Sequence, residues 1–333
     1  MWQFFQCAVT GRGHEQRQIP CQDKTYKFEY DGVSVISLAD GAGSARLSHY
    51  GASRVSEFIA KDLAENFNKY YTNSNGVEVK KYMITVLKTE LEALAEKHQC
   101  SIKDFASTLL FAAVKDDKFI IGHIGDGVIG YIKNNEIKVA SHPSNGEFAN
   151  VTVFITSDNA ISSFRLLKGT TKSGIDGFVL FSDGTENSFY DKRNKKISNA
   201  VKDIMNLVRV AKAEKIKDRI TEFFERKIKQ ATTDDCSMAI MVNNHNRNFA
   251  DLDIRTKADI LGVNLYKSNT KKKLQRYQEI LFALENKLTI KELSRLMHLK
   301  KKYMRRKISK PIFANLLEII DGKYQSILYF QED

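Results

Sequence analysis

The sequence has few of the features that mark membrane, secreted or disulfide-bonded proteins. No apolar run reaches the roughly 18 residues of a membrane span. The first residues do not combine a basic start with an apolar core, as a secretory signal would. The four cysteines, Cys7, Cys21, Cys100 and Cys236, form no C-x-x-C pair and predict neither a disulfide framework nor structural zinc. These absences favour a cytoplasmic protein with reduced thiols and no membrane partner.

Motifs of three common enzyme classes are also missing or disfavoured. There is no G-x-x-x-x-G-K-[ST] loop for nucleotide phosphates and no G-x-S-x-G nucleophile elbow. A covalent cysteine mechanism is disfavoured because Cys236 follows an acidic pair, which would raise the pKa of the thiol and suppress the thiolate.

Positive charge is the unusual property of an otherwise ordinary composition. The chain is 42% hydrophobic and 28% charged, as in folded domains, which excludes a disordered or collagenous protein. The net charge is +12, and residues 251–333 carry 18 Lys/Arg against 10 Asp/Glu, so +8 of the excess lies there. An anionic partner is therefore expected at this C-terminal segment first.

Period-2 apolar patterns predict strands within residues 1–242. The expected strands are 33–38, 108–114, 118–122, 128–132, 152–156, 177–182 and 236–242. Short links predict two antiparallel hairpins, one joining 108–114 to 118–122 and one joining 118–122 to 128–132. Helical periodicity follows Tyr50 and covers 81–98 and 197–228. Clustered strands with helices beside them favour an α+β sandwich over a doubly wound parallel sheet.

A polar linker at 243–248 precedes a segment of helical pattern. We expect a first domain at 1–245 and a basic helical domain at 251–333, with helices at 271–286, 290–297, 301–308 and 312–320. Thr289 is the expected N-cap of the helix at 290, and 300–310 stands where a helix-turn-helix places its recognition helix. This basic segment is expected first to pack on the first domain or to bind a protein partner. The alternatives are contact with nucleic acid through residues 271–310 and binding to an acidic membrane surface.

Aspartates recur where the predicted strands begin or end. The set is Asp23, Asp40 with Gly41, Asp126, Asp183, and the pair Asp234 and Asp235. Converging carboxylates repel one another unless a cation joins them, and Mg²⁺ or Mn²⁺ prefers oxygen ligands. Two such ions about 3.5–4 Å apart can hold a hydroxide for in-line attack on phosphorus. A single Asp-Gly is a common turn, but the whole ordered set predicts a divalent metal site.

The ordered set resembles the metal-dependent Ser/Thr phosphatases of the protein phosphatase 2C type, in particular their bacterial branch. The motifs, which cover about residues 1–242, are Gln22-Asp23, Asp40-Gly41-Ala42-Gly43, Ser107-Thr108-Leu109, Gly125-Asp126, Phe181-Ser182-Asp183-Gly184 and Asp234-Asp235-Cys236-Ser237. The resemblance implies a four-layer αββα sandwich with two central antiparallel sheets, to which the small all-α C-terminal domain would be added. It also implies hydrolysis of phosphoserine or phosphothreonine on proteins by a hydroxide bridging two Mn²⁺ or Mg²⁺ ions, and a cognate Ser/Thr kinase.

The same resemblance implies a role for each motif residue. Asp40 would bridge the two metals, with the Gly41 carbonyl completing one coordination sphere. Asp183 and Asp234 would hold the first metal. Asp23 would lie beside the metal-bound water or bind the second ion through water.

Two site roles, that of a metal ligand and that of the phosphate-binding residue, each have two candidate residues. At the last motif the resemblance favours Asp234 as ligand over Asp235. The family places an arginine shortly before its first acidic motif to hold the phosphate, and here His14 or Arg17 would take that role by a charge-assisted hydrogen bond.

Three positions depart from the family pattern. Gln22 and Ala42 replace a glutamate and a histidine of eukaryotic relatives. Asp126 matches the carboxylate of a third metal, but Asn187 stands where its partner is expected, so two ions are favoured over three. These departures leave a second hypothesis open: a catalytically weak or inactive phosphatase-like regulator whose basic tail binds nucleic acid or a partner protein.

Overall fold

The computed structural model describes residues 1–144, 152–245, 248–309 and 316–330. The chain forms two compact units. The larger unit comprises Trp2–Lys202 and Ile220–Val242, and the smaller comprises Met1, Asp203–Arg219 and Asn243–Asp333. Because the smaller unit also takes residues 203–219, the division into domains 1–245 and 251–333 stays a prediction. In the described part of the chain, no helix is both long and apolar enough to cross a membrane.

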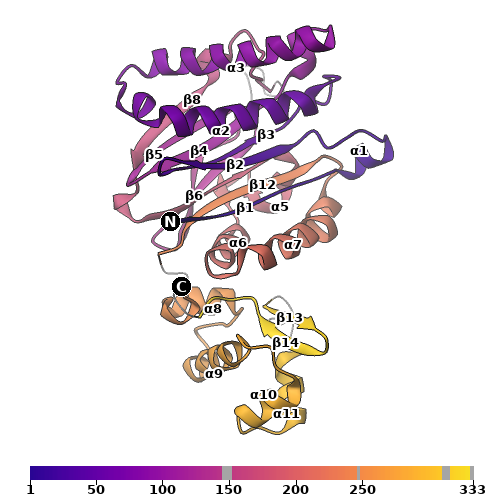
Figure 1. Ribbon diagram of the computed structural model, residues 1–333, viewed down its shortest axis with the longest axis vertical. Helices are drawn as coiled ribbons and strands as arrows, with labels where there is room; N and C mark the ends of the chain where they lie inside the picture. The colour runs from indigo at the N-terminus through magenta and orange to yellow at the C-terminus, as the bar shows by residue number, and fades with distance from the viewer. Residues whose placement is uncertain (145–151, 246–247, 310–315, 331–333) are drawn as a thin grey trace. The chain divides into compact units, whose positions relative to one another are not determined.

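The larger unit is built on two five-stranded sheets (Figure 1). The first has the order β2-β3-β4-β5-β8, with each neighbouring pair antiparallel. Its strands are β2 (Lys24–Tyr30), β3 (Val33–Ala39), β4 (Leu109–Lys115), β5 (Lys118–Ile124) and β8 (Arg165–Thr170). The second has the order β1-β12-β9-β6-β7, and its strands are β1 (Trp2–Val9), β12 (Cys236–Asn243), β9 (Ile175–Phe181), β6 (Val128–Lys133) and β7 (Glu136–Ser141). The predicted α+β fold with two central antiparallel sheets is confirmed.

Two hydrophobic layers hold the larger unit together. The helices α2 (Ser48–Thr72) and α3 (Gly76–His98), both predicted, cover one face of the first sheet, as Figure 1 shows. Apolar residues at helical spacing, such as Val55, Ile59 and Leu63, bury this face of α2. The other face of the sheet packs on the second sheet, where Leu110 of β4 and Phe178 of β9 belong to one cluster. The strand ends of both sheets are thereby fixed on one scaffold.

Three sequence predictions about the strands are wrong. The second predicted hairpin does not form, because β5 and β6 lie in different sheets and Gly125, with φ +112°, turns the chain between them. Segment 152–156 forms no strand in its described residues, where a single bridge at residue 152 is followed by turns. Four strands of the two sheets, β1, β2, β7 and β8, were missed. All four are edge strands, and half-buried polar residues weaken the alternation in β7 and β8.

Shorter elements complete the larger unit and lead into the smaller one. They are α1 (Arg12–Gln16), α4 (Ala160–Ser163), α5 (Glu186–Phe189), β10 (Tyr190–Asp191) and β11 (Lys196–Ile197). The predicted helical region 197–228 is confirmed as α6 (Asn199–Val210), α7 (Ala213–Phe223) and a π-helical turn (Phe224–Ile228).

Three of the four helices predicted for the basic segment form in the smaller unit. They are α9 (Thr270–Ala283), α10 (Ile290–Leu296) and α11 (Lys301–Ile308), and α8 (Ile254–Ile260) is a further helix that was not predicted. Thr289 is the N-cap of α10, as expected: its side chain accepts from the Glu292 amide, and the Glu292 side chain accepts from the Thr289 amide. This capping box explains why α10 begins where it does.

The predicted helix at 312–320 is wrong over its described part, and the unit is not all-α. Residues 317–326 form a hairpin of β13 (Leu317–Ile320) and β14 (Lys323–Ser326). The two residues between the strands, Asp321 and Gly322, have φ +53° and +73°, which is the geometry of a type I′ turn. The preference of this Asp-Gly pair for a hairpin turn is stronger than the helical preference indicated by the apolar residues before it. Residues 310–315 lie outside the described part.

Candidate metal centre

A cavity of about 360 Å³ lies where strands of both sheets end in the larger unit. Asp40 and Asp126 follow β3 and β5 of the first sheet, whereas Asp183 follows β9 and Asp234 precedes β12 of the second. The predicted site residues in its lining are His14, Arg17, Asp40, Gly41, Asp126, Asp183 and Asp234. Asp23 and Asp235 are outside that lining. Residues predicted to act together from separate motifs thus come together in space.

Three carboxylates form an acidic cluster in this cavity. Asp40, Asp126 and Asp183 each place an oxygen within 4.8 Å of the other two. Burial raises the pKa of Asp40 well above its usual value, and the carboxylates of Asp23 and Asp183 add to the effect. Burial, followed by the charge of Asp126, raises the pKa of Asp183 to about 6. The folded chain therefore holds these carboxylates together at a cost that a bound cation would remove.

The backbone at Asp40 is fixed by Thr108, which directly precedes β4. Thr108 Oγ1 accepts from the Asp40 amide at 2.9 Å, and the Thr108 amide donates to the Asp40 carbonyl at 2.8 Å. The next residue, Gly41, lies so close to α2 that a Cβ there would stand 2.8 Å from Cβ of Ser48. A side chain at Gly41 would therefore displace either the helix or Asp40.

Asp23 lies behind the cluster, with 1% of its surface exposed. Ser182 Oγ donates to Asp23 Oδ2 at 2.7 Å and accepts from the Ser237 amide at 3.1 Å, so three strand ends are joined. Burial raises the pKa of Asp23 to about 7. Sequence reasoning missed the role of Ser182, although it directly precedes Asp183 in the fifth motif.

The two acidic neighbours at β12 face different surroundings. Asp234 lines the cavity, whereas Asp235 is 2% exposed and has both oxygens engaged. Asp235 Oδ1 accepts from the Gly11 amide at 2.7 Å, and Oδ2 accepts from the Gln22 amide at 2.6 Å. His14 Nδ1 also lies 2.9 Å from Asp235 Oδ1, at ion-pair distance though not aligned as a hydrogen bond. Asp235 thus holds the two loops that carry His14 and Gln22.

The two phosphate-binding candidates both line the cavity but differ in exposure. His14 belongs to α1 and is 6% exposed, with Asp235 beside it. Arg17 is exposed, and its Nε donates to the Gly13 carbonyl at 3.0 Å, which leaves the end of the guanidinium toward solvent. Both side chains lie at the cavity wall.

A third metal at Asp126 would require the expected partner residue to lie beside it in the cavity. Asn187, at the expected partner position, lies outside the cavity lining, and neighbouring Glu186 pairs instead with Lys192 at 2.7 Å. Thr152 Oγ1 donates to Asp126 Oδ2. Thr152 was predicted only as part of a strand, and nothing in the local pattern identified it as a site residue.

The donor set fits Mg²⁺ or Mn²⁺. All the carboxylates at the cavity offer hard oxygen atoms, which these ions prefer. Two buried oxygens, Asp183 Oδ1 and Gln22 Oε1, have no hydrogen-bond partner in the described structure. Buried polar atoms are almost always satisfied, so these oxygens indicate a missing cation or ordered water at the cavity.

The chain resembles known proteins both in sequence and in fold. The protein phosphatase 2C family model matches residues 10–225. Over 190 residues the chain is 26% identical to serine/threonine-protein phosphatase 3 of Escherichia coli K12, covering 56% of this chain and 74% of the relative. It superposes on a crystal structure of a bacterial serine phosphatase with a TM-score of 0.50 and 18% identity, covering 72% of this chain and 96% of the other. A bacterial serine phosphatase in which one arginine is replaced by lysine gives a TM-score of 0.51 at 16% identity, covering 72% and 96%.

Proposed function

Because the chain belongs to the protein phosphatase 2C family, we propose that it hydrolyses phosphoserine and phosphothreonine on proteins with two Mn²⁺ or Mg²⁺ ions. Membership of the family and the likeness to a bacterial serine/threonine phosphatase make it a phosphatase of that type. The observation that carries the metal-dependent mechanism is the cluster of Asp40, Asp126 and Asp183, whose oxygens lie within 4.8 Å of one another.

The ligands of the metal pair are proposed from position and availability. Asp40 would bridge the ions, with the Gly41 carbonyl beside it, and Asp183 and Asp234 would complete the first site. Asp234 is preferred to its neighbour because it lines the cavity, whereas both oxygens of Asp235 already accept hydrogen bonds. When bound, the divalent ions supply charge neutralisation and a water of lowered pKa near the phosphorus.

The other side chains would position the reactants. Asp23, whose Oδ2 accepts a hydrogen bond from Ser182 Oγ, would lie beside the metal-bound water or bind the second ion through water. His14 or Arg17 would hold a phosphate oxygen at the cavity wall by a charge-assisted hydrogen bond, and Asp235 Oδ1 lies 2.9 Å from His14 Nδ1. Asp126, steadied by Thr152, would bind a third ion only weakly because Asn187 is not beside it.

Partners follow from this activity. A phosphoprotein substrate is implied, and a cognate Ser/Thr kinase that would phosphorylate it stays a prediction, as does a cytoplasmic location. The phosphatase site itself gives no support for a nucleic-acid partner at residues 271–310, which stays a prediction.

The proposal is tested by phosphate release from a phosphothreonine peptide with the full-length protein. We expect release to require Mn²⁺ or Mg²⁺, to stop with EDTA, and to fall by at least about 100-fold in Asp40→Asn, since the bridging carboxylate is lost. Asp116→Asn is the matched control: Asp116 is exposed in the β4–β5 turn, and its φ of +53° suits asparagine. Metal-independent release, or an Asp40→Asn variant as active as the control, would refute the mechanism. A folded protein without any turnover or metal binding would instead support the inactive regulator.

A further inference from the structure

The smaller unit exposes a row of cations on α11. Lys301, Lys302, Arg305 and Arg306 are exposed, while Met304 on the same helix is buried. Positions i, i+1, i+4 and i+5 lie on one face of a helix, so the four charges share a face. In the described part of the chain, no carboxylate forms an ion pair with any of the four. They concentrate positive charge that the fold does not neutralise.

Two other cations of the same unit form ion pairs within it. Arg276 of α9 pairs with Glu279 at 3.1 Å, and Lys215 of α7 pairs with Glu318 of β13 at 2.9 Å. Neither of these ion pairs involves α11. Like charges four positions apart destabilise an isolated helix by a few tenths of a kcal/mol per pair. The four cations of α11 therefore lower the stability of the helix that carries them.

The two helices α10 and α11 form a helix-turn-helix. Four residues, 297–300, link them, and His298 at φ +50° ends the first helix in the left-handed conformation. Lys300 is the N-cap of α11. The second helix of such a pair is the one that enters the DNA major groove, and here it is the helix with the unpaired cations.

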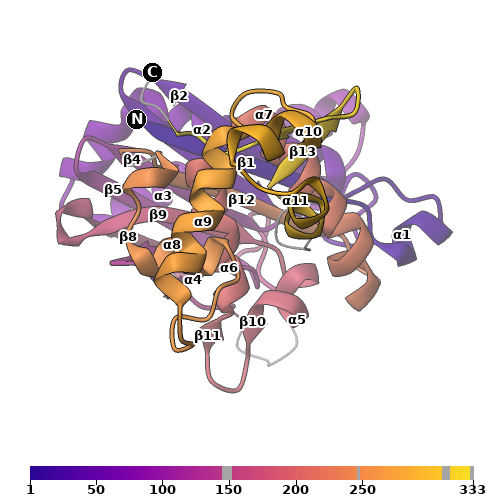
Figure 2. The same ribbon diagram turned by 90° about the horizontal axis from the view of Figure 1, so that it is seen from below.

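A hairpin stands beside this pair. Leu288 exchanges both backbone hydrogen bonds with Tyr324 of β14, at 3.0 and 2.8 Å, so the hairpin is tied to the segment that enters α10. Figures 1 and 2 both show α10 and α11 next to β13 and β14. The hairpin cannot swing away from α11 without breaking these bonds.

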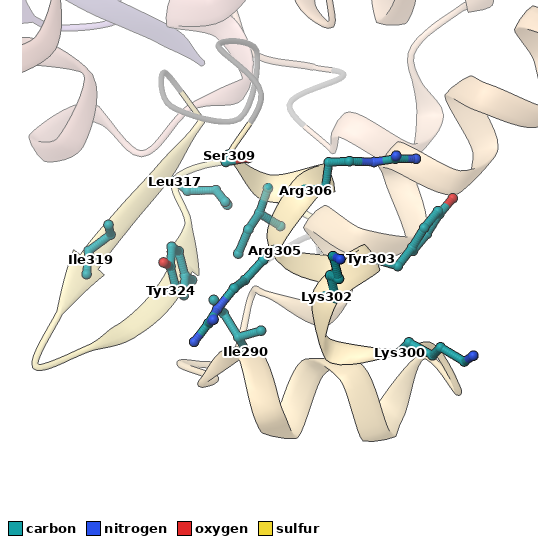
Figure 3. A pocket seen from close by; sticks show the side chains of 11 residues that line it. Ile290, Lys300, Lys302, Tyr303, Arg305, Arg306, Ser309, Leu317, Ile319 and Tyr324 are labelled. Carbon is teal, nitrogen blue, oxygen red and sulfur yellow. The ribbon is translucent and has the colours of Figure 1, made fainter.

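A cavity of about 970 Å³ lies between α11 and the hairpin. Figure 3 shows Arg305 extending from α11 toward the hairpin, while Lys300 and Arg306 point to the other side. The hairpin contributes Leu317, Ile319 and Tyr324 to the same cavity. The surface thus combines guanidinium and ammonium groups with apolar and aromatic side chains.

We propose that this unit binds duplex DNA, with α11 in the major groove and the hairpin against the adjacent backbone. The major groove, about 12 Å wide, admits an α-helix, and arginine binds guanine edges and phosphates through paired donors. The helix-turn-helix order favours a duplex over an acidic protein, because it places the four cations on the helix that such a pair inserts into the major groove.

The test is fluorescence anisotropy of the full-length protein with a labelled duplex of about 20 base pairs. A duplex of that length covers about two helical turns and so offers a complete major groove to α11. We expect saturable binding at about 50 mM salt, with log Kd rising linearly with log salt concentration. Lys302→Gln/Arg306→Gln should weaken binding by at least about 10-fold and reduce the magnitude of the salt slope by about 2, since two phosphate or base contacts are lost.

The control is Lys81→Gln/Lys97→Gln, which removes the same charge from exposed positions of α3. It should leave both the affinity and the slope nearly unchanged, and neither double variant should alter phosphate release. Absence of binding at low salt, or an equal loss in both double variants, would overturn the proposal. Tighter binding of polyglutamate or of anionic vesicles than of the duplex, lost only in the α11 variant, would overturn it in favour of an acidic protein or membrane partner.

Discussion

At the scale of single residues, the positions of the clustered aspartates were predictable and the hydrogen bonds of Asp235 were not. Asp40, Asp126 and Asp183 each follow a strand, and strand ends can be located from the apolar pattern. Asp235 holds the amides of Gly11 and Gln22, which lie 224 and 213 positions away in the chain. No local pattern encodes contacts at that separation, so the hydrogen bonds of Asp235 were not predictable from the sequence.

Replacement of Asp235 tests this distinction. Asp235→Asn keeps one oxygen but turns an NH₂ toward a backbone amide, so a buried donor loses its acceptor. We expect the free energy of unfolding to fall by about 1–3 kcal/mol, measured by urea denaturation in EDTA. Asp234→Asn, at the cavity, should leave that stability within about 0.5 kcal/mol and instead weaken Mn²⁺ binding. Equal destabilisation by the two variants would show that the two residues do not divide the roles in this way.

At the scale of elements, the outcome depends on which local signal is stronger. Helices α2 and α3 follow long apolar periodicities, and the capping residue of α10 was identified from its sequence alone. The close spacing of apolar residues before Asp321 predicts a helix. The structure follows the turn instead, since Asp321 and Gly322 both adopt positive φ and close a two-residue hairpin.

Replacement of the turn glycine tests this explanation. Gly322→Ala adds a Cβ that meets nothing within 4 Å, so its cost arises from the positive φ alone. We expect a loss of about 1 kcal/mol, measured as faster amide hydrogen exchange in β13 and β14. Gly76→Ala at the start of α3, also without contacts and without a positive φ, should cost nothing. If the hairpin amides are protected equally in the two variants, the turn does not control the hairpin.

At the scale of the whole molecule, the pairing of strands that lie far apart in the chain could not be predicted from the sequence. The motifs in family order predicted two antiparallel sheets, but the division of β5 and β6 between them depends on partners far along the chain. The positive charge is also unevenly distributed along the chain. The net charge of residues 251–333 pointed to a basic segment, and the structure places four unpaired cations on one face of α11 within it.

The raised carboxyl pKa values make stability depend on pH and on metal. Asp23 and Asp183 titrate near 7 and near 6 in the folded chain, against 3.8 when unfolded, so the native state binds more protons between those values. Their contribution to the stability of the metal-free protein is therefore full below about pH 3.8 and is lost as pH rises to about 7. Mn²⁺ should raise Tm more at about pH 7.5 than at about pH 5, because protons compete with the ion at the lower pH. A Tm increase that is larger at the lower pH would contradict the assignment of these carboxylates to the metal site.

The central claim is that the acidic cluster holds divalent ions, and calorimetric titration of EDTA-stripped full-length protein with Mn²⁺ tests it most directly. We predict about two ions bound per chain, with proton release that grows as the pH falls from about 7.5 toward 6. Asp40→Asn should lose saturable binding, and Asp116→Asn should retain it. No saturable heat in the wild-type protein, or equal binding by the two variants, would contradict the account.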